Sequence, residues 1–166
     1  KGGRTYFEIK PFYQFRSLEI THDNVNDFPP NTGVTVGETI RERSNGIEIA
    51  VEYDNSDFPV NPSKGSFTRA GLTRDFGGFD SADSWTSVEF DWRKYVGFGD
   101  SKWFSQQVLA VTAWSAYVPT WEDVQVSATE FIIQNRPPSN KGATLGGVNR
   151  MRGYTRARFS DKAAIY

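Results

Sequence analysis

The sequence predicts an all-β chain: an antiparallel up-and-down meander that forms part of a transmembrane β-barrel. A two-residue alternation of apolar and polar side chains recurs along the 166 residues, and no segment shows a helical period. Aromatic residues make up 15% of the chain although the hydrophobic total is only 37%. This combination is typical of a barrel with an apolar outer surface, aromatic girdles and a polar interior.

Three stretches alternate most clearly, and in each the apolar side chains fall on one face. They are Phe7 to Arg16, Ile47 to Asp54 and Thr86 to Arg93. Less regular strands are predicted at about Ser66 to Phe76 and Phe104 to Val118, and a sixth begins near Asp161. Most of these runs reach the ~9–11 residues that a tilted membrane strand requires.

The connections between the predicted strands alternate between short and long. Compact turns are predicted at Asp57 to Gly65 and at Gly97 to Lys102, and loops at 21–45, 77–84 and 120–160. Outer-membrane barrels show this rhythm, with short periplasmic turns and longer extracellular loops. An ordinary small domain seldom contains two structureless loops of this length.

A soluble β-sandwich would produce the same alternation, because it also has one wet face and one dry face. A soluble carbohydrate- or ligand-binding module is therefore the main alternative from periodicity alone. The length of the strands and their clean, ring-rich apolar faces favour the membrane. Two cations in the apolar phase, Arg74 and Lys94, lie near predicted strand ends, where a barrel tolerates them at a cost of ~0–1 kcal/mol.

Charge, cysteine and histidine content argue against several other classes of protein. The formal net charge of -1 shows no basic bias, so nucleic acid is not expected as a partner. The chain has no cysteine, and its single histidine, His22, lies in a predicted polar loop without a nucleophile motif nearby. We therefore expect no enzyme activity, no cofactor and no metal site.

Both ends of the chain resemble cuts within a longer protein. The chain begins at Lys1 with neither an initiator Met nor an apolar leader, and it stops at Tyr166 within a predicted strand. We expect residues 1–166 to be an internal piece of a barrel with about six strands. Open strand edges would make such a piece prone to self-association.

A basic segment near the C-terminus carries the most distinctive motifs. Residues 141–162 contain six Lys or Arg and one acid. The motifs in it are Leu145-Gly146-Gly147, Arg152-Gly153-Tyr154 and Arg158-Phe159. Upstream, a turn is marked by Asp57, Pro59, Asn61, Pro62 and Gly65.

These motifs, in this order over about a hundred residues, resemble the barrel domain of the BamA/TamA-type assembly factors, the bacterial surface antigen family. The resemblance covers roughly Gly46 to Tyr166. It implies a protein of the Gram-negative outer membrane that inserts or exports other outer-membrane proteins without making or breaking bonds. The implied partners are the lipid bilayer, unfolded outer-membrane protein clients, and periplasmic or lipoprotein partners.

Two features leave the subfamily open. POTRA repeats typically precede such a barrel, some members of the family fuse a patatin-like phospholipase domain upstream, and that fusion is a further alternative. The segment 124–141, with Pro137 and Pro138, is a long insertion compared with the family pattern.

The resemblance also implies roles for the long loop at 119–162, which in the family folds back into the barrel lumen. Arg152, Gly153 and Tyr154 would carry its function, because a guanidinium pairs well with carboxylates away from bulk water. Gly153 would allow a tight turn, and Tyr154 would add a flat contact with a polar tip. In the family the acidic partners lie mainly on strands that follow the loop. The wet-face acids on the strands present, which are candidates to line the lumen, are Glu48, Glu52, Glu89 and Asp91.

Overall fold

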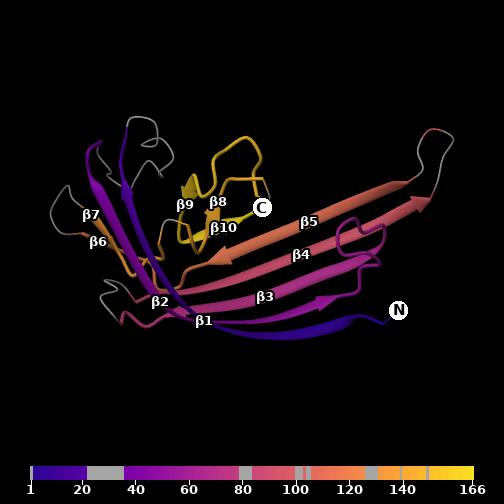
Figure 1. Cartoon of the computed structure of the whole chain (residues 1–166), viewed down its shortest axis with the longest axis horizontal. Coiled ribbons are helices and arrows are strands. Elements are labelled where there is room, and N and C mark those ends of the chain that lie inside the picture. Colours follow the sequence, from indigo (N-terminus) through magenta and orange to yellow (C-terminus); the bar gives the residue numbers. More distant parts are fainter. Residues whose placement is uncertain are drawn as a thin grey trace.

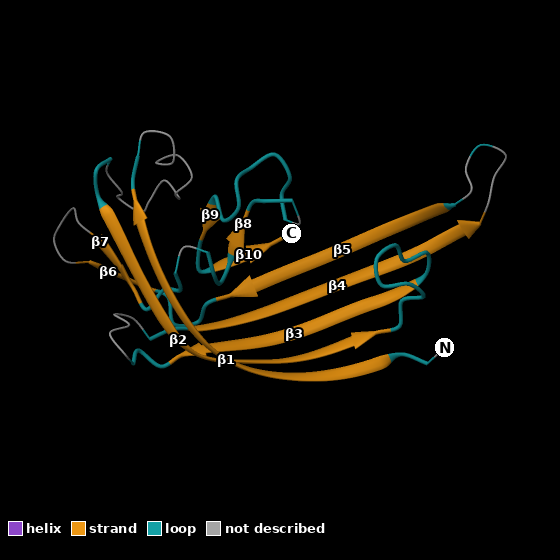
Figure 2. Ribbon diagram, in the orientation of Figure 1, coloured by secondary structure: helices purple, strands orange, loops and turns teal. Residues whose placement is uncertain are grey.

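The chain folds mainly into one long, curved sheet. The computed structural model describes residues 2–21, 36–78, 84–99, 103, 106–125, 131–138, 140–148 and 150–166. These residues contain ten β-strands, six of which form an antiparallel sheet in the order β1-β2-β3-β4-β5-β10 (Figures 1 and 2). In the described ranges there is no helix of the length and apolarity needed to cross a membrane.

Five strands of this sheet are long enough to span a membrane. They are β1 Arg4–Glu19, β2 Thr39–Asp54, β3 Gly65–Asp75, β4 Thr86–Gly99 and β5 Gln107–Tyr117. The sixth strand, β10 Ala163–Ile165, pairs with the end of β5. The predicted all-β antiparallel meander is therefore confirmed. The sheet does not close into a barrel, and β1 and β10 form its two edges.

One face of the sheet carries a continuous apolar surface. Side chains directly opposite one another form a row across five strands, and each is between 44% and 72% exposed. The row runs through Ile9, Ile49, Leu72, Val88 and Tyr117. Among the described residues no second sheet covers this face, so the two-layer interior of a soluble sandwich is not formed.

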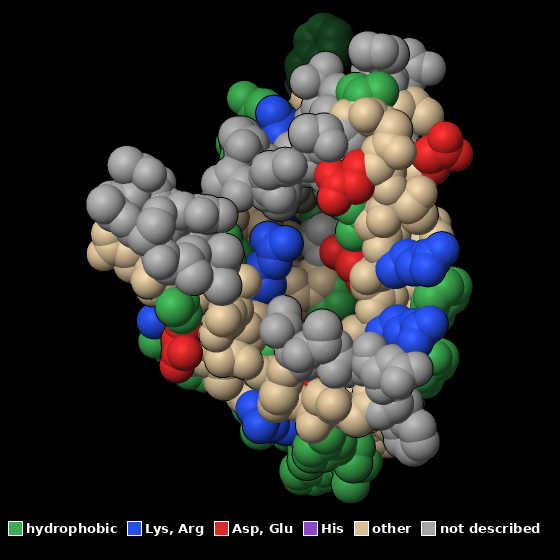
Figure 3. All heavy atoms as spheres, turned by 90° about the vertical axis from the view of Figure 1, so that its left-hand side faces the viewer, with side chains coloured by type: hydrophobic (Ala, Val, Ile, Leu, Met, Phe, Trp, Pro, Cys, Tyr) green, Lys and Arg blue, Asp and Glu red, His purple; other side chains and the backbone are tan. Residues whose placement is uncertain are grey.

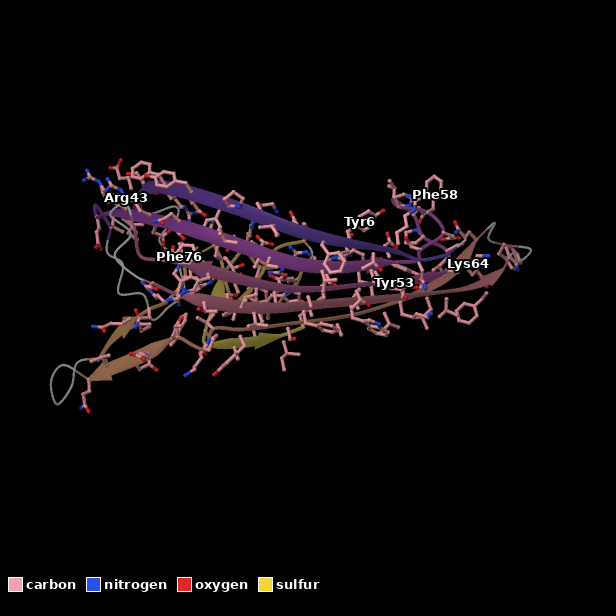
Figure 4. The ribbon with its side chains drawn as sticks, turned by 90° about the horizontal axis from the view of Figure 1, so that it is seen from below. Tyr6, Arg43, Tyr53, Phe58, Lys64 and Phe76 are labelled. Atoms are coloured by element: carbon pink, nitrogen blue, oxygen red, sulfur yellow. The ribbon has the colours of Figure 1, made fainter. Side chains whose placement is uncertain are left out.

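Aromatic side chains lie near both ends of the sheet. Figure 4 shows Tyr6, Tyr53 and Phe58 at the end that carries the β2–β3 turn, and Phe76 at the opposite end. All four are exposed, from 41% for Tyr53 to 60% for Phe58. The placement agrees with the aromatic girdles that the composition predicts.

The connections sort to the two ends of the sheet as predicted. The strand ends that lead into the β2–β3 and β4–β5 connections lie at one end of the sheet, and those that lead into the β1–β2, β3–β4 and β5–β10 connections lie at the other (Figure 1). Parts of these connections, including His22 and Phe104, fall outside the described residues. β4 continues past the predicted Arg93 to Gly99, so part of the predicted turn is strand.

Two segments predicted as loops contain strands. Residues 39–45 belong to β2 and pair with β1, but Arg41, Glu42 and Arg43 place charges on both faces, so no apolar alternation revealed the strand. The predicted loop at 120–160 contains four short strands. They are β6 Glu122–Gln125, β7 Phe131–Gln134, β8 Thr144–Leu145 and β9 Phe159–Ser160. Strands of two to four residues are too short to show a period.

A buried carboxylate fixes the point where β3 leaves β2. Asp75 is fully buried and pairs with Gly46 at the end of the β2–β3 ladder. Its carboxylate accepts the backbone N–H of Asn45 at 3.0 Å, the N–H of Gly77 at 2.8 Å and the Ser44 hydroxyl. A Cβ on Gly46 would overlap the carbonyl oxygen of Arg74, so glycine is required for this close approach.

We expect Asp75→Asn to lower the free energy of unfolding by about 2 kcal/mol, because an amide nitrogen replaces an accepting oxygen and leaves a buried donor unpaired. The measurement is the urea midpoint of the full-length protein folded in detergent. Asp54→Asn is the matched control, since its retained oxygen still accepts the Ser56 N–H. Equal midpoints for the two variants would contradict this account of Asp75.

Candidate functional site: the loop between β5 and β10

The loop from Val118 to Lys162 packs against the polar face of the sheet through a small apolar core. Trp114 and Ala116 of β5 and Val118, Trp121 and Ala143 of the loop are at most 5% exposed. Figure 1 shows β8 and β9 of this loop lying over the sheet close to β10. The loop is therefore a folded element with its own core on the wall.

Arg150 adds a charged anchor beside this core. Its Nη2 atom lies 2.7 Å from Oε1 of Glu89, and its guanidinium carbon lies 3.8 Å from the centroid of the Trp114 ring. The indole N–H of Trp114 donates to the same Glu89 oxygen at 2.8 Å. Burial lowers the pKa of Arg150, while the negative charge of Glu89 acts in the opposite direction. The carboxylate and the ring face together replace part of the hydration that the cation loses.

The sequence predicts Glu89 as a lumen acid, but its partners Arg150 and Trp114 are functional residues that sequence reasoning missed. Arg150 lies within a basic run, where any one charge is most simply explained as solvated. Trp114 lies in a stretch whose two faces are both apolar, which hides its orientation. The one available signal was the position of Trp114 in the alternation, because it falls on the face that carries polar side chains in the other strands.

The Arg-Gly-Tyr motif forms a tight turn in the same loop. Gly153 has a φ of 96°, in the left-handed region that glycine favours, as the sequence predicts. Arg152 is exposed, and its Nε donates to the carbonyl of Val148 at 3.3 Å. In the part of the chain that the structure describes, Arg152 makes no ion pair. Its predicted pairing with an acid remains a prediction.

The other motif residues come together around this turn. Leu145 of β8 pairs with Phe159 of β9, and the Tyr154 ring lies edge-on at 5.2 Å from the Phe159 ring. Gly146 and Gly147 both have positive φ, and the Gly147 N–H donates to the Tyr154 carbonyl at 2.9 Å. The guanidinium of Arg158 lies 5.8 Å from the centroid of the Phe159 ring. The Leu-Gly-Gly, Arg-Gly-Tyr and Arg-Phe segments thus form one compact unit.

The predicted lumen acids lie on the face that the loop covers, and most of them are paired. Glu48 pairs with Arg69, and Asp91 pairs with Arg93 at 2.6 Å. Glu52 makes no ion pair with any described residue. Seen from the loop end, the molecule is hollowed, and Lys or Arg and Asp or Glu side chains line the hollow (Figure 3). The wall is therefore polar and close to charge-balanced.

The predicted turn between β2 and β3 is organised by one carboxylate. Asp57 accepts the N–H groups of Ser63 at 2.8 Å and Lys64 at 3.2 Å, together with the Ser63 hydroxyl. The hydroxyl of Ser63 is the main cause that lowers the pKa of Asp57 to about 2. Gly65 closes the turn with a φ of 110°. Exposed or half-exposed residues, Pro59, Asn61 and Pro62, form its tip.

The chain matches the model of a known protein family. The model of the Omp85 superfamily domain matches residues 5–164, which is nearly the whole chain. No curated protein and no solved structure matches the chain.

We expect Arg150→Ala to loosen the loop by about 2 kcal/mol, because Glu89 loses a charge-assisted hydrogen bond and Trp114 loses its cation. Proteinase K should then cut the loop about thirtyfold faster in the full-length protein folded in detergent. The matched control is Arg156→Ala, which removes an exposed arginine of the same loop that forms no side-chain hydrogen bond or ion pair with a described residue. Equal cleavage rates in the two variants would show that Arg150 is not an anchor.

The carboxyl of Asp57 should titrate near pH 2 in the folded protein, against an ordinary value of 3.8. The folded pKa is the lower one, so this carboxylate stabilises the turn fully above pH 3.8 and loses that effect as the pH falls through about 2. Carbon NMR of labelled aspartate in micelles measures the midpoint. Ser63→Ala should move the midpoint upward, and an unmoved midpoint would rule out Ser63 as the cause.

Proposed function

This chain belongs to the Omp85 superfamily, and we propose that it forms part of the wall and the lumen loop of an outer-membrane insertion or translocation factor. Its clients are unfolded outer-membrane proteins that the complete barrel inserts into the membrane or exports. The observation that carries the proposal is a curved sheet with one exposed apolar face and a folded loop on the polar face.

The lipid bilayer is the proposed partner of the apolar face. Soluble monomers rarely expose a contiguous apolar patch of more than a few hundred Å². Here the apolar row crosses five strands, and the rings of Phe7 and Phe90 continue the same face with 84% and 43% exposure. Hydrocarbon would cover this face, and water in the lumen would solvate the charged wall on the other side.

In this proposal the chain forms a fixed part of the barrel wall and does not contain the seam that opens to a client strand. Unpaired backbone groups are costly in lipid, so the outer edges of β1 and β10 would pair with further strands. The weakly paired seam at which a client strand adds would lie among those strands. Such a mechanism makes no covalent bond and needs no cofactor. Periplasmic domains or lipoproteins are the proposed partners at the end that carries the β2–β3 turn.

Arg152 and Tyr154 are proposed to secure the loop to the far side of the lumen. Arg150 already holds the loop to β4 and β5, whereas Arg152 and Tyr154 are exposed on the same loop. A carboxylate on one of the further strands would complete the contact. The resemblance of the motif to the family supports this role.

The full-length protein in lipid vesicles should accelerate the folding of an unfolded outer-membrane protein, measured by the shift in gel mobility when the client barrel folds. Two neighbouring substitutions on β3 test the lipid-facing assignment in the same vesicles. Leu72→Arg should block integration, because a cation in the middle of the lipid face costs ~2–4 kcal/mol. Thr73→Arg should integrate normally, because Thr73 faces the lumen opposite Glu48.

The two parts of this experiment fail in different ways. Equal integration of both variants would remove the lipid-facing assignment. Normal integration without faster client folding would remove the assembly function and leave the membrane assignment in place.

A further inference from the structure

The outward face of the sheet changes from apolar to cationic at its loop end. On β2 the outward positions beyond Ile47 include Arg43 and Arg41, and on β3 Arg74 lies directly opposite Ile47. At this end of β1, β2 and β3 the described outward positions carry these three arginines and one acid, Glu19. The net charge of this surface, which we call the arginine rim after its three arginines, is therefore positive.

The inward face of the same strand ends is covered by the β5–β10 loop. The Gln14 side-chain amide donates to the Asn140 side-chain oxygen at 3.1 Å. The ammonium of Lys141 lies 3.6 Å from the centroid of the Phe12 ring. Contacts within the protein thus hold the inward face, whereas the arginine rim lies on the face that the proposed function turns to lipid.

Arg74 is held in a defined orientation at the edge of the apolar face. Its side chain is half-buried, and its Nη1 atom donates to the Thr86 hydroxyl at 2.8 Å. The Thr86 N–H in turn donates to the Thr120 hydroxyl at 2.9 Å. The hydroxyl of Thr86 is neutral, and Arg74 forms no ion pair with any described residue. A guanidinium has five N–H donors, so Arg74 can also donate to an anion from outside the chain.

Arg41 and Arg43 lie beside exposed rings. The guanidinium carbon of Arg43 is 5.4 Å from the centroid of the Phe15 ring, which is 53% exposed. Tyr13 and Phe76 are exposed as well, and Figure 4 shows Arg43 and Phe76 at the same end of the sheet. Arg41 and Arg43 are two positions apart on one strand, so about 7 Å separates their Cα atoms and both can reach one anion. Rings beside cations are typical of the boundary between hydrocarbon and lipid headgroups.

The depth of the arginine rim in a membrane follows from the length of β3. The outward positions from Ser66 to Arg74 cover roughly 27 Å along the strand, and a tilt of about 40° reduces this to roughly 20 Å along the membrane normal. This height is close to the ~25 Å apolar band of a barrel. Lys94, which pairs with Ser66, marks the other edge of the band. Arg74 therefore lies where hydrocarbon gives way to headgroups.

The two edges of the band differ in the type of cation. The described outward cations at the loop end of β1, β2 and β3 are all arginines, whereas Lys94 and Lys64 lie at the turn end, where Figure 4 labels Lys64. A guanidinium offers a planar fork that matches two phosphate oxygens, whereas an ammonium acts as a point charge. The phosphate of a lipid headgroup is therefore the anion that suits the loop end.

We propose that the arginine rim binds the phosphate groups of membrane lipids in the leaflet at the loop end. Arg41 and Arg43 hold one headgroup together, and Arg74 holds a second at the edge of the hydrocarbon. The exposed rings contact the upper part of the acyl chains, and the bound lipids fix the depth of the wall in the membrane. This inference rests on the lipid-facing side of the proposed function and does not depend on client assembly.

Native mass spectrometry of the full-length protein in detergent tests the arginine rim. Short-chain phosphatidic acid is the probe, and the matching diacylglycerol, which lacks the phosphate, should not bind. Arg74→Gln and the double variant Arg41→Gln with Arg43→Gln should each weaken binding of phosphatidic acid about tenfold, because each removes charge-assisted hydrogen bonds to phosphate. Arg156→Gln is the matched control, since it removes the same charge from an exposed arginine of the β5–β10 loop.

Arg74→Lys separates phosphate recognition from simple attraction of charge. Lysine keeps the charge and loses the fork, so this variant should recover only part of the affinity that Arg74→Gln loses. Full affinity in Arg74→Lys would overturn binding through a guanidinium fork. Equal affinities for phosphatidic acid in the rim variants and in the Arg156→Gln control would overturn the arginine rim, and so would equal binding of the diacylglycerol.

These results are separable from those that test the proposed function. Equal integration of Leu72→Arg and Thr73→Arg would remove the lipid-facing assignment on which the arginine rim rests. If Leu72→Arg alone fails to integrate and the rim variants bind phosphatidic acid as the control does, only the arginine rim is removed. The rate of client folding enters neither comparison.

Discussion

Strand register is the constraint on which the rest of the structure depends. The apolar row from Ile9 to Tyr117 is continuous because every ladder pairs apolar with apolar side chains. A slip of one residue in any ladder would turn a whole strand over and place its charges on the apolar face. The close approach at Gly46 and the carboxylate of Asp75 fix the β2–β3 ladder at one end, and the turn around Asp57 fixes it at the other.

The same register determines the electrostatics of the opposite face. Once the apolar residues face outward, the alternating acids and cations must share the inner wall. Cross-strand pairs such as Glu48 with Arg69 keep that wall near neutrality, and each exposed pair contributes little stability alone. Glu89 differs because its main partner, Arg150, comes from the loop 61 positions later. Most charges of the inner wall are balanced within the wall, whereas Glu89 pairs with the loop. The wall around Glu89 is therefore a docking site for that loop.

A structural feature can be predicted from the sequence when the residues that determine it lie close together along the chain. Strands such as 47–54 are predictable because hydrocarbon or a dry core requires apolar side chains on one face. The resulting alternation is visible in consecutive residues. The strand segment 39–45 was missed because the charged side chains of Arg41, Glu42 and Arg43 fall on both faces and hide the period. Gly153 and the Asp57 turn are predictable because local backbone geometry demands those residue types. Arg150 and Lys141 were missed because their partners are supplied only by the tertiary fold.

Stability is distributed unevenly over the loop, and this has a physical consequence for the lumen. An apolar core such as that around Val118 and Trp121 is lost only when water enters it, so its contacts break together. Single polar contacts such as that of Asn140 with Gln14 exchange readily with water at little net cost. The contacts of the loop with the core at β5 are therefore lost together, whereas a single polar contact with β1 can be exchanged for water on its own.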